Sequence, residues 1–391
     1  MKLKNISYAF IAGLSLLAFA GCSKEKAKTY TIKVTDLDGE VLGQKKIKLN
    51  SYDSVLDALN DNFDVVSSKS EYGTYITSIN HSIVDSKWSL MLYENGVESS
   101  TGIDGVTADD GDVFEFKNEC WYTPSKWGTY DEYDVNVDIA IYHFLKTGAK
   151  ELASADKDDL SNYWLYTFYN MMNVTDDYYK VNVSQEFENY IKNYDVTGHT
   201  GTIYGKYYYI AKALNVDLTN FKTAYETYLN SDSFANTYSD YDTPFEISPA
   251  YSLNITNQKI TDIVNSNYVC STEWGTDAVA WQGAVLPMFG YTNKDLLNGL
   301  TTRKTDWGSI SCAIQLQAFA AFNENPRDSK YEVEGTDIIE CLFDNYYNTD
   351  KKTLYISNAN ELITKNTAQL YASLAAYKVQ RDNGEAAFIF A

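Results

Sequence analysis

The chain has 391 residues, of which 45% are hydrophobic and 22% charged, a balance that is ordinary for a globular protein and excludes general disorder. The length predicts two domains. Asp and Glu number 53 against 32 Lys and Arg, so the net charge is −21 and we expect no nucleic-acid partner, because such a chain repels phosphate backbones. Tyrosine is frequent, at 34 residues, which indicates either an AT-rich genome or a tyrosine-lined binding surface.

The first segment has the pattern of a signal peptide over residues 1–21. Lys2 and Lys4 supply the charged start and residues 10–20 the apolar core, which is too short for a comfortable membrane span. We therefore expect export out of the cytoplasm.

The apolar core ends in the sequence LAFAGC, which resembles the lipobox of bacterial lipoproteins. This resemblance implies that Cys22 is diacylated and becomes the first mature residue. Residues 22–28, with three lysines, then form a tether next to anionic headgroups. The implied location is the extracytoplasmic face of the cell membrane, with the lipid as anchor.

Residues 29–120 alternate between apolar and polar positions and predict a small β-grasp-like α+β domain. Turn signals at Asp36–Gly39, Glu94–Gly96 and Asp109–Asp112 separate the elements. The predicted strands are Tyr30–Thr35, Val41–Leu49, Tyr72–Ile79, Trp88–Tyr93 and Val113–Phe116, and a short helix covers Ser54–Asn60.

Several motifs of this domain carry a resemblance. Trp88–Gly96 (WSLMLYENG), Thr101–Ile103 and Asp109–Val113 resemble the C-terminal β domain of transcobalamin and intrinsic factor. They are more similar still to bacterial relatives of that domain, a family of unknown function found in surface lipoproteins. Ser54–Leu59 and Tyr75–Asn80 fit the same pattern. For Trp88 and the turn glycines, core filling and turn formation are the favoured interpretation.

Residues 121–391 change to helical periodicity and predict an all-α domain. Several helices are apolar on more than one face, which indicates an inner, buried layer. The predicted helices are 134–147, 160–173, 184–193, 203–215, 218–229, 276–289, 309–322, 337–346 and 367–380, with shorter pieces between them.

A faint repeat runs through this region. Lys126–Thr129, Glu273–Thr276 and Asp306–Ser309 each place Trp-Gly and a hydroxyl residue before an apolar helix, and Gly201–Gly205 and Thr367–Ala376 are of related type. These segments resemble the helical repeats of α/α toroids, which include prenyltransferase β subunits, terpenoid cyclases and the α domain of intrinsic factor. A generic helical solenoid is the alternative.

The sequence contains no recognisable set of catalytic residues, so we do not expect the chain to be an enzyme. Asp156–Asp159 matches the DxDD string of terpenoid cyclases, but its polar surroundings favour an interhelix loop over a dry acid site. His81, His143 and His199 lie far apart, and no Cys/His spacing indicates zinc. The four cysteines of the body allow two disulfides in three pairings or free buried thiols: Cys120, Cys270, Cys312 and Cys341.

Together the two resemblances imply a lipoprotein that holds a ligand between its β domain and its toroid. In the vitamin carriers these domain types enclose cobalamin, although here their order is reversed; a corrinoid is therefore the expected ligand, passed on to a membrane transporter, and no cofactor is required. The candidate ligand-binding residues lie at the loop-to-helix starts: Trp127, Tyr130, Tyr204, Trp274, Asp277, Trp281, Gln282, Trp307 and Gln315. For each tryptophan, packing between repeats is an equally good interpretation.

Two other classes of function stay open. An adhesion or interaction module for protein or glycan predicts a flat, exposed aromatic patch. A toroid lyase or hydrolase acting on polysaccharide predicts a pocket with a cluster of titratable groups whose pKa values are shifted.

Overall fold

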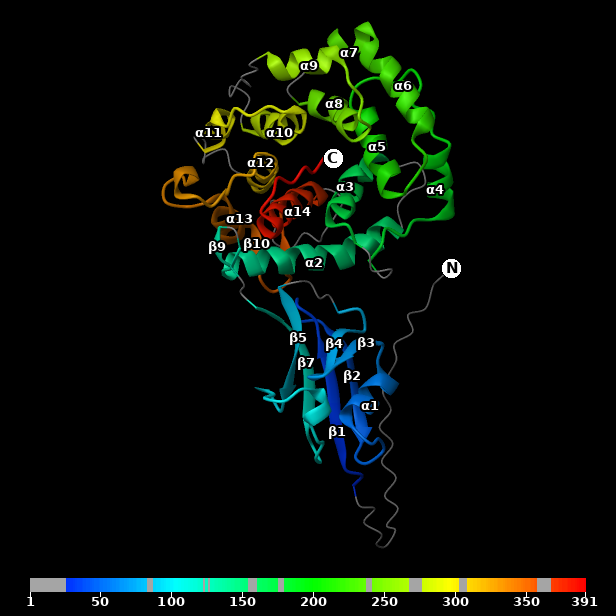
Figure 1. Cartoon of the computed structure of the whole chain (residues 1–391), viewed down its shortest axis with the longest axis vertical. Coiled ribbons are helices and arrows are strands. Elements are labelled where there is room, and N and C mark those ends of the chain that lie inside the picture. Colours follow the sequence, from blue (N-terminus) through cyan, green and yellow to red (C-terminus); the bar gives the residue numbers. More distant parts are fainter. Residues whose placement is uncertain are drawn as a thin grey trace, which may run out of the picture.

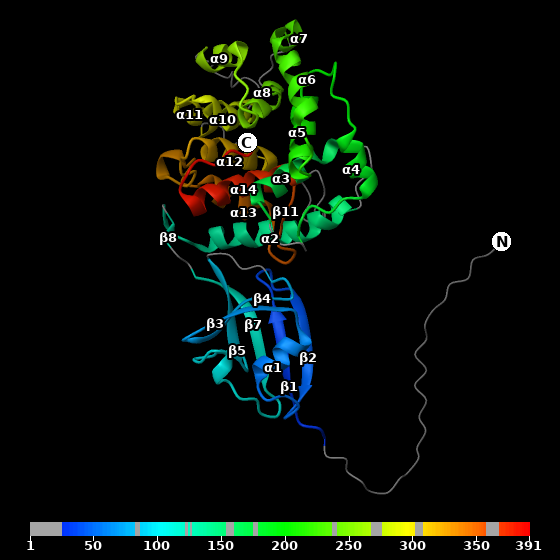
Figure 2. The same cartoon turned by 45° about the vertical axis from the view of Figure 1, so that its right-hand side comes forward.

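The computed structural model describes residues 26–82, 87–121, 124–125, 127–153, 160–174, 179–236, 241–266, 276–301, 308–356 and 367–391. It confirms a small β-rich N-terminal region and a helical C-terminal region, which lie end to end (Figures 1 and 2). The long helix α2 (Glu132–Ala153) forms the side of the helical region that faces the β-rich region (Figure 1).

The N-terminal region is built on a five-stranded sheet of order β2-β1-β7-β5-β6. β1 runs parallel to β7, with Ile32 opposite Phe114, and the other neighbours are antiparallel. The described elements are β1 (Thr29–Thr35), β2 (Val41–Lys48), α1 (Val55–Asn62), β3 (Val65–Ser70), β4 (Gly73–Ile79), β5 (Trp88–Glu94), β6 (Val97–Glu98), η1 (Ile103–Gly105) and β7 (Val113–Cys120).

Alternation along the strands produces the core of this region. Ile32, Val34, Phe114 and Phe116 point to one face of the sheet and pack with the buried side of α1 in a single cluster. Ser54 caps α1 by accepting a hydrogen bond from the backbone N–H of Asp57 at 3.0 Å. The predicted helix therefore begins one residue after its capping serine.

The helical region contains the predicted helices and some additional ones. Beyond the short pairs β8 (Pro124–Ser125) with β9 (Gly128–Thr129) and β10 (Tyr347–Asn348) with β11 (Thr353–Leu354), the regular elements are helical. They are α3 (Tyr163–Met172), α4 (Gln185–Lys192), α5 (Ile203–Ala213), α6 (Thr219–Asn230), α7 (Asp232–Asn236), α8 (Thr243–Ser252), α9 (Gln258–Asn265), α10 (Asp277–Val285), α11 (Asp295–Thr301), α12 (Ser309–Ala321), α13 (Ile338–Tyr346) and α14 (Ala368–Asn383), with 3₁₀ turns η2 (Leu160–Asn162), η4 (Leu286–Phe289) and η6 (Ser329–Tyr331).

Six of these helices pack side by side in a closed order: α3, α5, α8, α10, α12, α14 and back to α3. Figure 1 shows them inside the other helices of this region. They are the segments whose apolar residues surround the helix; in α10, for example, every residue from Ala278 to Val285 is buried. The expected inner layer is therefore present.

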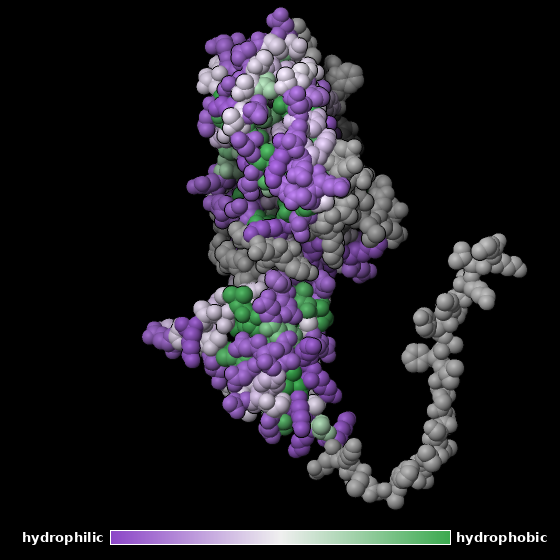
Figure 3. Space-filling model, turned by 90° about the vertical axis from the view of Figure 1, so that its right-hand side faces the viewer, coloured by the Kyte–Doolittle hydropathy of each residue, from purple (hydrophilic) through white to green (hydrophobic). Residues whose placement is uncertain are grey.

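None of the helices in the described part of the chain has both the length and the apolar character needed to cross a membrane. The surface of the helical region is mostly hydrophilic in the view of Figure 3, whereas apolar residues gather on the β-rich region close to the helical one.

Candidate functional site

The two regions meet through buried, paired charges. The turn between β1 and β2 places Asp36 and Asp38 against α2, where Nζ of Lys146 lies 2.6 Å from Asp36 and 2.9 Å from Asp38. Burial alone would lower the pKa of Lys146, but the two carboxylates outweigh burial and raise that pKa to about 12. Nδ1 of His143 lies 3.2 Å from Asp38, so His143 also belongs to this contact.

A second set of charges lies deeper. The indole Nε1 of Trp88 donates to Asp138 of α2 at 3.0 Å, and Arg381 of α14 donates to the other oxygen of Asp138 at 2.7 Å. Arg381 also donates to Tyr130 at 2.6 Å and to Asp134 at 3.1 Å. Both Asp138 and Arg381 are fully enclosed, with exposed fractions of 0% and 1%.

The pKa values of this second set show that its charges compensate one another. Burial would raise the pKa of Asp138, but the charges of Arg381 and Lys378 hold that pKa below its usual range. The pKa of Asp382 is low for the same reasons, burial opposed by Lys378 and Arg381, and Lys87 of the β-rich region lies 2.5 Å from it. We call this whole set of contacts the junction network. Its members are Asp36, Asp38, Lys87, Trp88, Tyr130, Asp134, Asp138, His143, Lys146, Lys378, Arg381 and Asp382.

The junction network has the shifted pKa values of a catalytic site but not its accessibility. Its carboxylates and cations are paired with each other, and its central members are closed to solvent over the described residues. Trp88 belongs to the core cluster of the helical region, not to that of its own sheet. The network therefore joins the two regions, and we assign it no chemistry.

The centre of the helical ring is filled by the segment 387–391. Phe390 is completely buried, and its ring centroid lies 5.4 Å from that of Phe245, 5.7 Å from that of Tyr209 and 6.0 Å from those of Trp164 and Trp281. Figure 1 shows this end of the chain inside the ring. The aromatic centre is thus occupied by the protein itself.

An open pocket of about 600 Å³ lies between α6 and the loop before α5. Most of its lining residues carry a hydroxyl or amide group, and one imidazole and one carboxylate are also present. The lining residues are Asp195, Thr197, Gly198, His199, Thr200, Tyr204, Asn220, Thr223, Ala224, Thr227, Tyr228, Ser231 and Ser233, and we call this site the α6 pocket.

Buried hydrogen bonds hold the α6 pocket in shape. The hydroxyl of Tyr228 accepts from the backbone N–H of Gly201 at 3.0 Å and donates to Glu246 at 2.7 Å. Burial raises the pKa of Glu246, so its proton is held more firmly than that of an ordinary carboxyl group. Tyr204 stacks on Tyr228 with centroids 4.6 Å apart, and His199 stacks on Tyr194 at 5.8 Å. These contacts hold the loop before α5 on its buried side, while the pocket-lining threonines of that loop are exposed.

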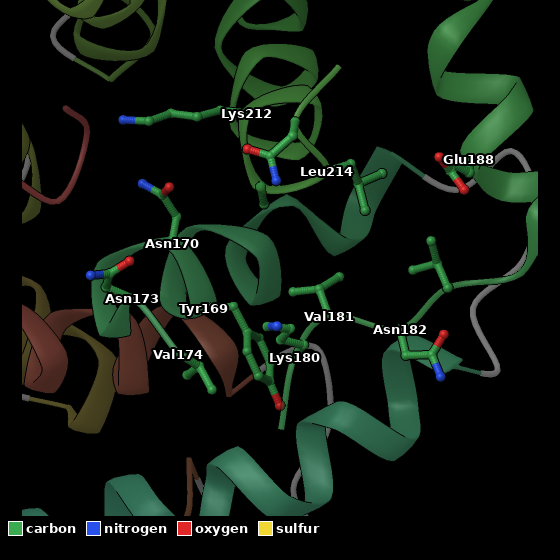
Figure 4. Close-up of a pocket in the computed structure, with 13 residues that line it drawn as sticks. Tyr169, Asn170, Asn173, Val174, Lys180, Val181, Asn182, Glu188, Lys212 and Leu214 are labelled. Carbon is green, nitrogen blue, oxygen red and sulfur yellow. The ribbon is translucent and has the colours of Figure 1, made fainter. Parts of the chain in front are cut away.

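A second open pocket, of about 420 Å³, lies at the carboxyl ends of α3 and α5 (Figure 4). Figure 4 shows side chains from α3, from residues 180–182 and from α5 around it, with Glu188 of α4 at one side. Asn173 ends α3 and Asn215 follows α5, both with positive φ, as asparagine tolerates. Burial lowers the pKa of Lys212, whose Nζ donates to the backbone oxygen of Ala391. This pocket has a largely polar wall.

The structure distributes the predicted ligand-binding residues over several separate places. Tyr130 is buried in the junction network, and the half-buried Trp127 packs against the core of the helical region. Tyr204 lines the α6 pocket. The inner helices α10 and α12 carry the others that are described: Asp277, Trp281, Gln282 and Gln315.

The inner-helix candidates are close neighbours but are mostly buried. Gln315 Nε2 donates to the hydroxyl of Thr276 at 3.4 Å, and Trp281 stacks on Trp164 with centroids 5.4 Å apart. Asp277 is half-buried at the start of α10. Cys22, Trp274, Trp307, Cys270 and Asp156–Asp159 lie outside the described residues.

Sequence reasoning missed the hydroxyl groups of the α6 pocket and the residues of the junction network. Asp138 carried a signal, because it interrupts the apolar run of α2, and so did the apolar stretch Phe388–Phe390 after α14. Exposed threonines such as Thr223 and Thr227 carry no such signal, since they are ordinary on a helix surface. Among the described residues, no group of three or more His, Cys, Asp or Glu could hold a metal ion.

Comparison with known proteins places only part of the chain. Residues 53–119 match the model of a domain of unknown function, DUF4430. No curated protein gives a significant match. Among solved structures, one match is a protein of Ruminococcus gnavus ATCC 29149 described as a candidate metal-binding protein; it is 22% identical, with a TM-score of 0.22, over 24% of this chain and 99% of that one.

Proposed function

We propose that the chain is an envelope-anchored binding protein whose α6 pocket takes a neutral, hydroxyl-rich ligand such as a glycan. The observation that carries the proposal is the lining of that pocket, where Thr, Ser and Asn side chains from the loop before α5, from α6 and from the residues just after α6 surround an open volume of about 600 Å³. Hydroxyl and amide groups both donate and accept hydrogen bonds, which suits the hydroxyl groups of a sugar. The stacked pair His199 and Tyr194 offers an aromatic edge beside them.

Charge favours a neutral ligand over an acidic polysaccharide. The chain has a net charge of −21, so a polyuronate would be repelled on approach. Asp195 adds a further negative charge to the pocket wall, and backbone and side-chain hydrogen bonds from Thr197 keep its pKa low. These features support binding over the lyase alternative.

The distribution of shifted pKa values also supports binding over catalysis. Asp138 and Asp382, whose pKa values are lowered, belong to the junction network, where the acids and bases are paired and largely enclosed. A general acid or base must instead reach the substrate within hydrogen-bond distance. The buried Glu246 behind Tyr228 is occupied in holding the loop.

Two further parts of the proposal concern architecture. The closed order of the six inner helices supports an α/α toroid, and the sheet order with a parallel central pair supports a β-grasp-like domain. Cys22 provides the lipid anchor. Corrinoid capture between the domains is the second candidate; it is favoured by the resemblance of the motifs around Trp88–Gly96, a segment that lies within the DUF4430 match.

The test is a calorimetric titration of the chain from residue 23 onward with neutral oligosaccharides of gluco-, manno-, xylo- and galacto- type, with polygalacturonate and with cyanocobalamin. We expect saturable binding of at least one neutral oligosaccharide. Thr227→Val should weaken it about fivefold, as expected for the loss of one hydrogen bond. Asn182→Ala, in the pocket of Figure 4, is the matched control and should leave the affinity unchanged.

Three outcomes would contradict the proposal. Equal affinity for polygalacturonate would remove the argument from charge. Oligosaccharide binding that Asn182→Ala weakens and Thr227→Val does not would move the site to the other pocket. Cyanocobalamin binding without any oligosaccharide binding would favour the corrinoid candidate instead.

A further inference from the structure

Two of the three described cysteines lie on helices that pack against each other. Cys312 is in the first turn of the inner helix α12, and Cys341 lies in α13, which packs against α12. Both side chains are buried, with exposed fractions of 0% and 6%. The third, Cys120, ends β7 in the N-terminal sheet, opposite Trp88 of β5, and so belongs to a different region.

The two thiols are direct neighbours. They share a side-chain hydrogen bond. Burial and the charge that either sulfur would carry raise the pKa of the Tyr346 hydroxyl at the end of α13, so both sulfurs lie close to that group. Asn345 donates its side-chain amide to the sulfur of Cys341 at 3.8 Å. No disulfide joins the two in the structure, so the contact is a pair of reduced sulfurs held within one small cluster.

We propose that Cys312 and Cys341 form a structural disulfide that links the inner helix α12 to the outer helix α13 when the chain folds in an oxidising compartment. In the reaction each thiol loses its proton, and the two sulfurs together give up two electrons as the S–S bond forms. The oxidant is a second disulfide, from a thiol-disulfide oxidoreductase or oxidised glutathione, which is reduced to two thiols. The inference goes beyond ligand binding, and its test in vitro does not depend on the proposed ligand or location.

The surroundings of the pair indicate when the bond forms. The hydrogen bond with Cys341 and burial both raise the pKa of the Cys312 thiol, so little thiolate is present in the folded protein at neutral pH. Exchange requires a thiolate and an accessible sulfur. Oxidation should therefore occur during folding, and the finished bond should resist reduction as long as the protein stays folded.

The experiment refolds the reduced chain from residue 23 onward in a glutathione redox buffer and, in parallel, in a reducing buffer. Remaining thiols are alkylated in denaturant, and unreduced digests are mapped by mass spectrometry. We expect one cross-linked peptide pair that joins Cys312 to Cys341, and a melting temperature higher by roughly 5 °C than that of the reduced chain.

Variants sharpen this result. Cys341→Ser should abolish the cross-link and the gain in melting temperature, whereas Cys120→Ser should retain both. Mapping of the unmodified chain does not depend on whether a variant folds. Full alkylation of both cysteines after oxidative refolding, or a cross-link of either one to Cys270, would overturn the assignment.

Discussion

The junction network and the α6 pocket handle polar side chains in opposite ways. At the junction, Asp138, Arg381 and Lys87 are withdrawn from water and satisfied by one another. In the pocket, the hydroxyl groups of Thr223 and Thr227 stay exposed, although each also donates to a backbone oxygen one turn earlier. One arrangement uses polar groups to fix a geometry, and the other leaves them available to a ligand.

This difference separates the polar residues that stabilise the fold from the polar residues that are available to bind a ligand. A buried charge contributes specificity as long as its partner is present. Removal of the partner is strongly destabilising, because the remaining charge is then buried without a counterion or water. An exposed hydroxyl contributes little to folding. Enclosed, paired charges therefore characterise the junction between the regions, while most lining residues of the proposed site are neutral.

The largest expected effect comes from breaking the junction. Asp138→Ala leaves Arg381 buried without its main partner and should lower the free energy of unfolding by about 3–5 kcal/mol. Urea denaturation followed by far-UV circular dichroism measures it. Glu188→Ala, which removes an exposed pair with Lys192, is the control and should cost less than about 1 kcal/mol; equal losses would contradict the comparison.

The aromatic centre should respond almost as strongly. Phe390→Ala empties the space among Trp164, Phe245 and Trp281 and should cost about 3 kcal/mol, with a change in tryptophan emission. Phe388→Ala, at a half-buried position of the same segment, should cost clearly less. A neutral result for Phe390→Ala would show that the segment does not fill the ring in solution.

Acid should weaken the junction network. The pKa values of Asp38, Asp138 and Asp382 are lowered in the folded protein, so the unfolded chain binds more protons and stability falls as the pH drops below about 4. Glu246 acts in the opposite direction, because burial raises its pKa, and offsets part of the loss. Denaturation between pH 3 and pH 6 should show a shallower acid dependence for Asp138→Ala than for the unmodified chain; an identical slope would contradict this account.

The smallest effect on stability should belong to the pocket. Thr227→Val changes an exposed position of α6 and should alter the free energy of unfolding by less than about 0.5 kcal/mol. Thermal denaturation measures it. A loss of 2 kcal/mol or more would mean that the pocket wall is structural as well.

Much of the fold could be predicted, because it depends on local periodicity. The segment 309–322 is predicted as a helix, and α12 covers Ser309–Ala321. An apolar run of this length is typical of a buried helix and too long for a strand. The inner helix α8 was not among the predicted ranges, because Pro244 and Pro249 argue against a helix there. β3 (Val65–Ser70) was also missed, because its exposed serines lack the alternation of a buried strand.

Much less of the candidate site could be predicted. The turn Asp36–Gly39 was recognised, but nothing local indicates that Lys146, far along the chain, pairs with its carboxylates. Tyr204, a predicted ligand-binding residue, lies at the start of α5 and lines the α6 pocket; its part in binding stays a prediction. The hydroxyl groups opposite it come from α6, and only the packing of the helices brings them together.

The most direct test of the central claim is hydrogen–deuterium exchange of the chain from residue 23 onward, with and without cyanocobalamin and each neutral oligosaccharide of the panel. We predict that a bound oligosaccharide slows exchange in residues 194–204 and in α6, while the β1–β2 turn, the start of β5 and α2 keep the same protection. Slowing confined to the turn, β5 and α2 would contradict the account, because it would place the ligand between the two regions.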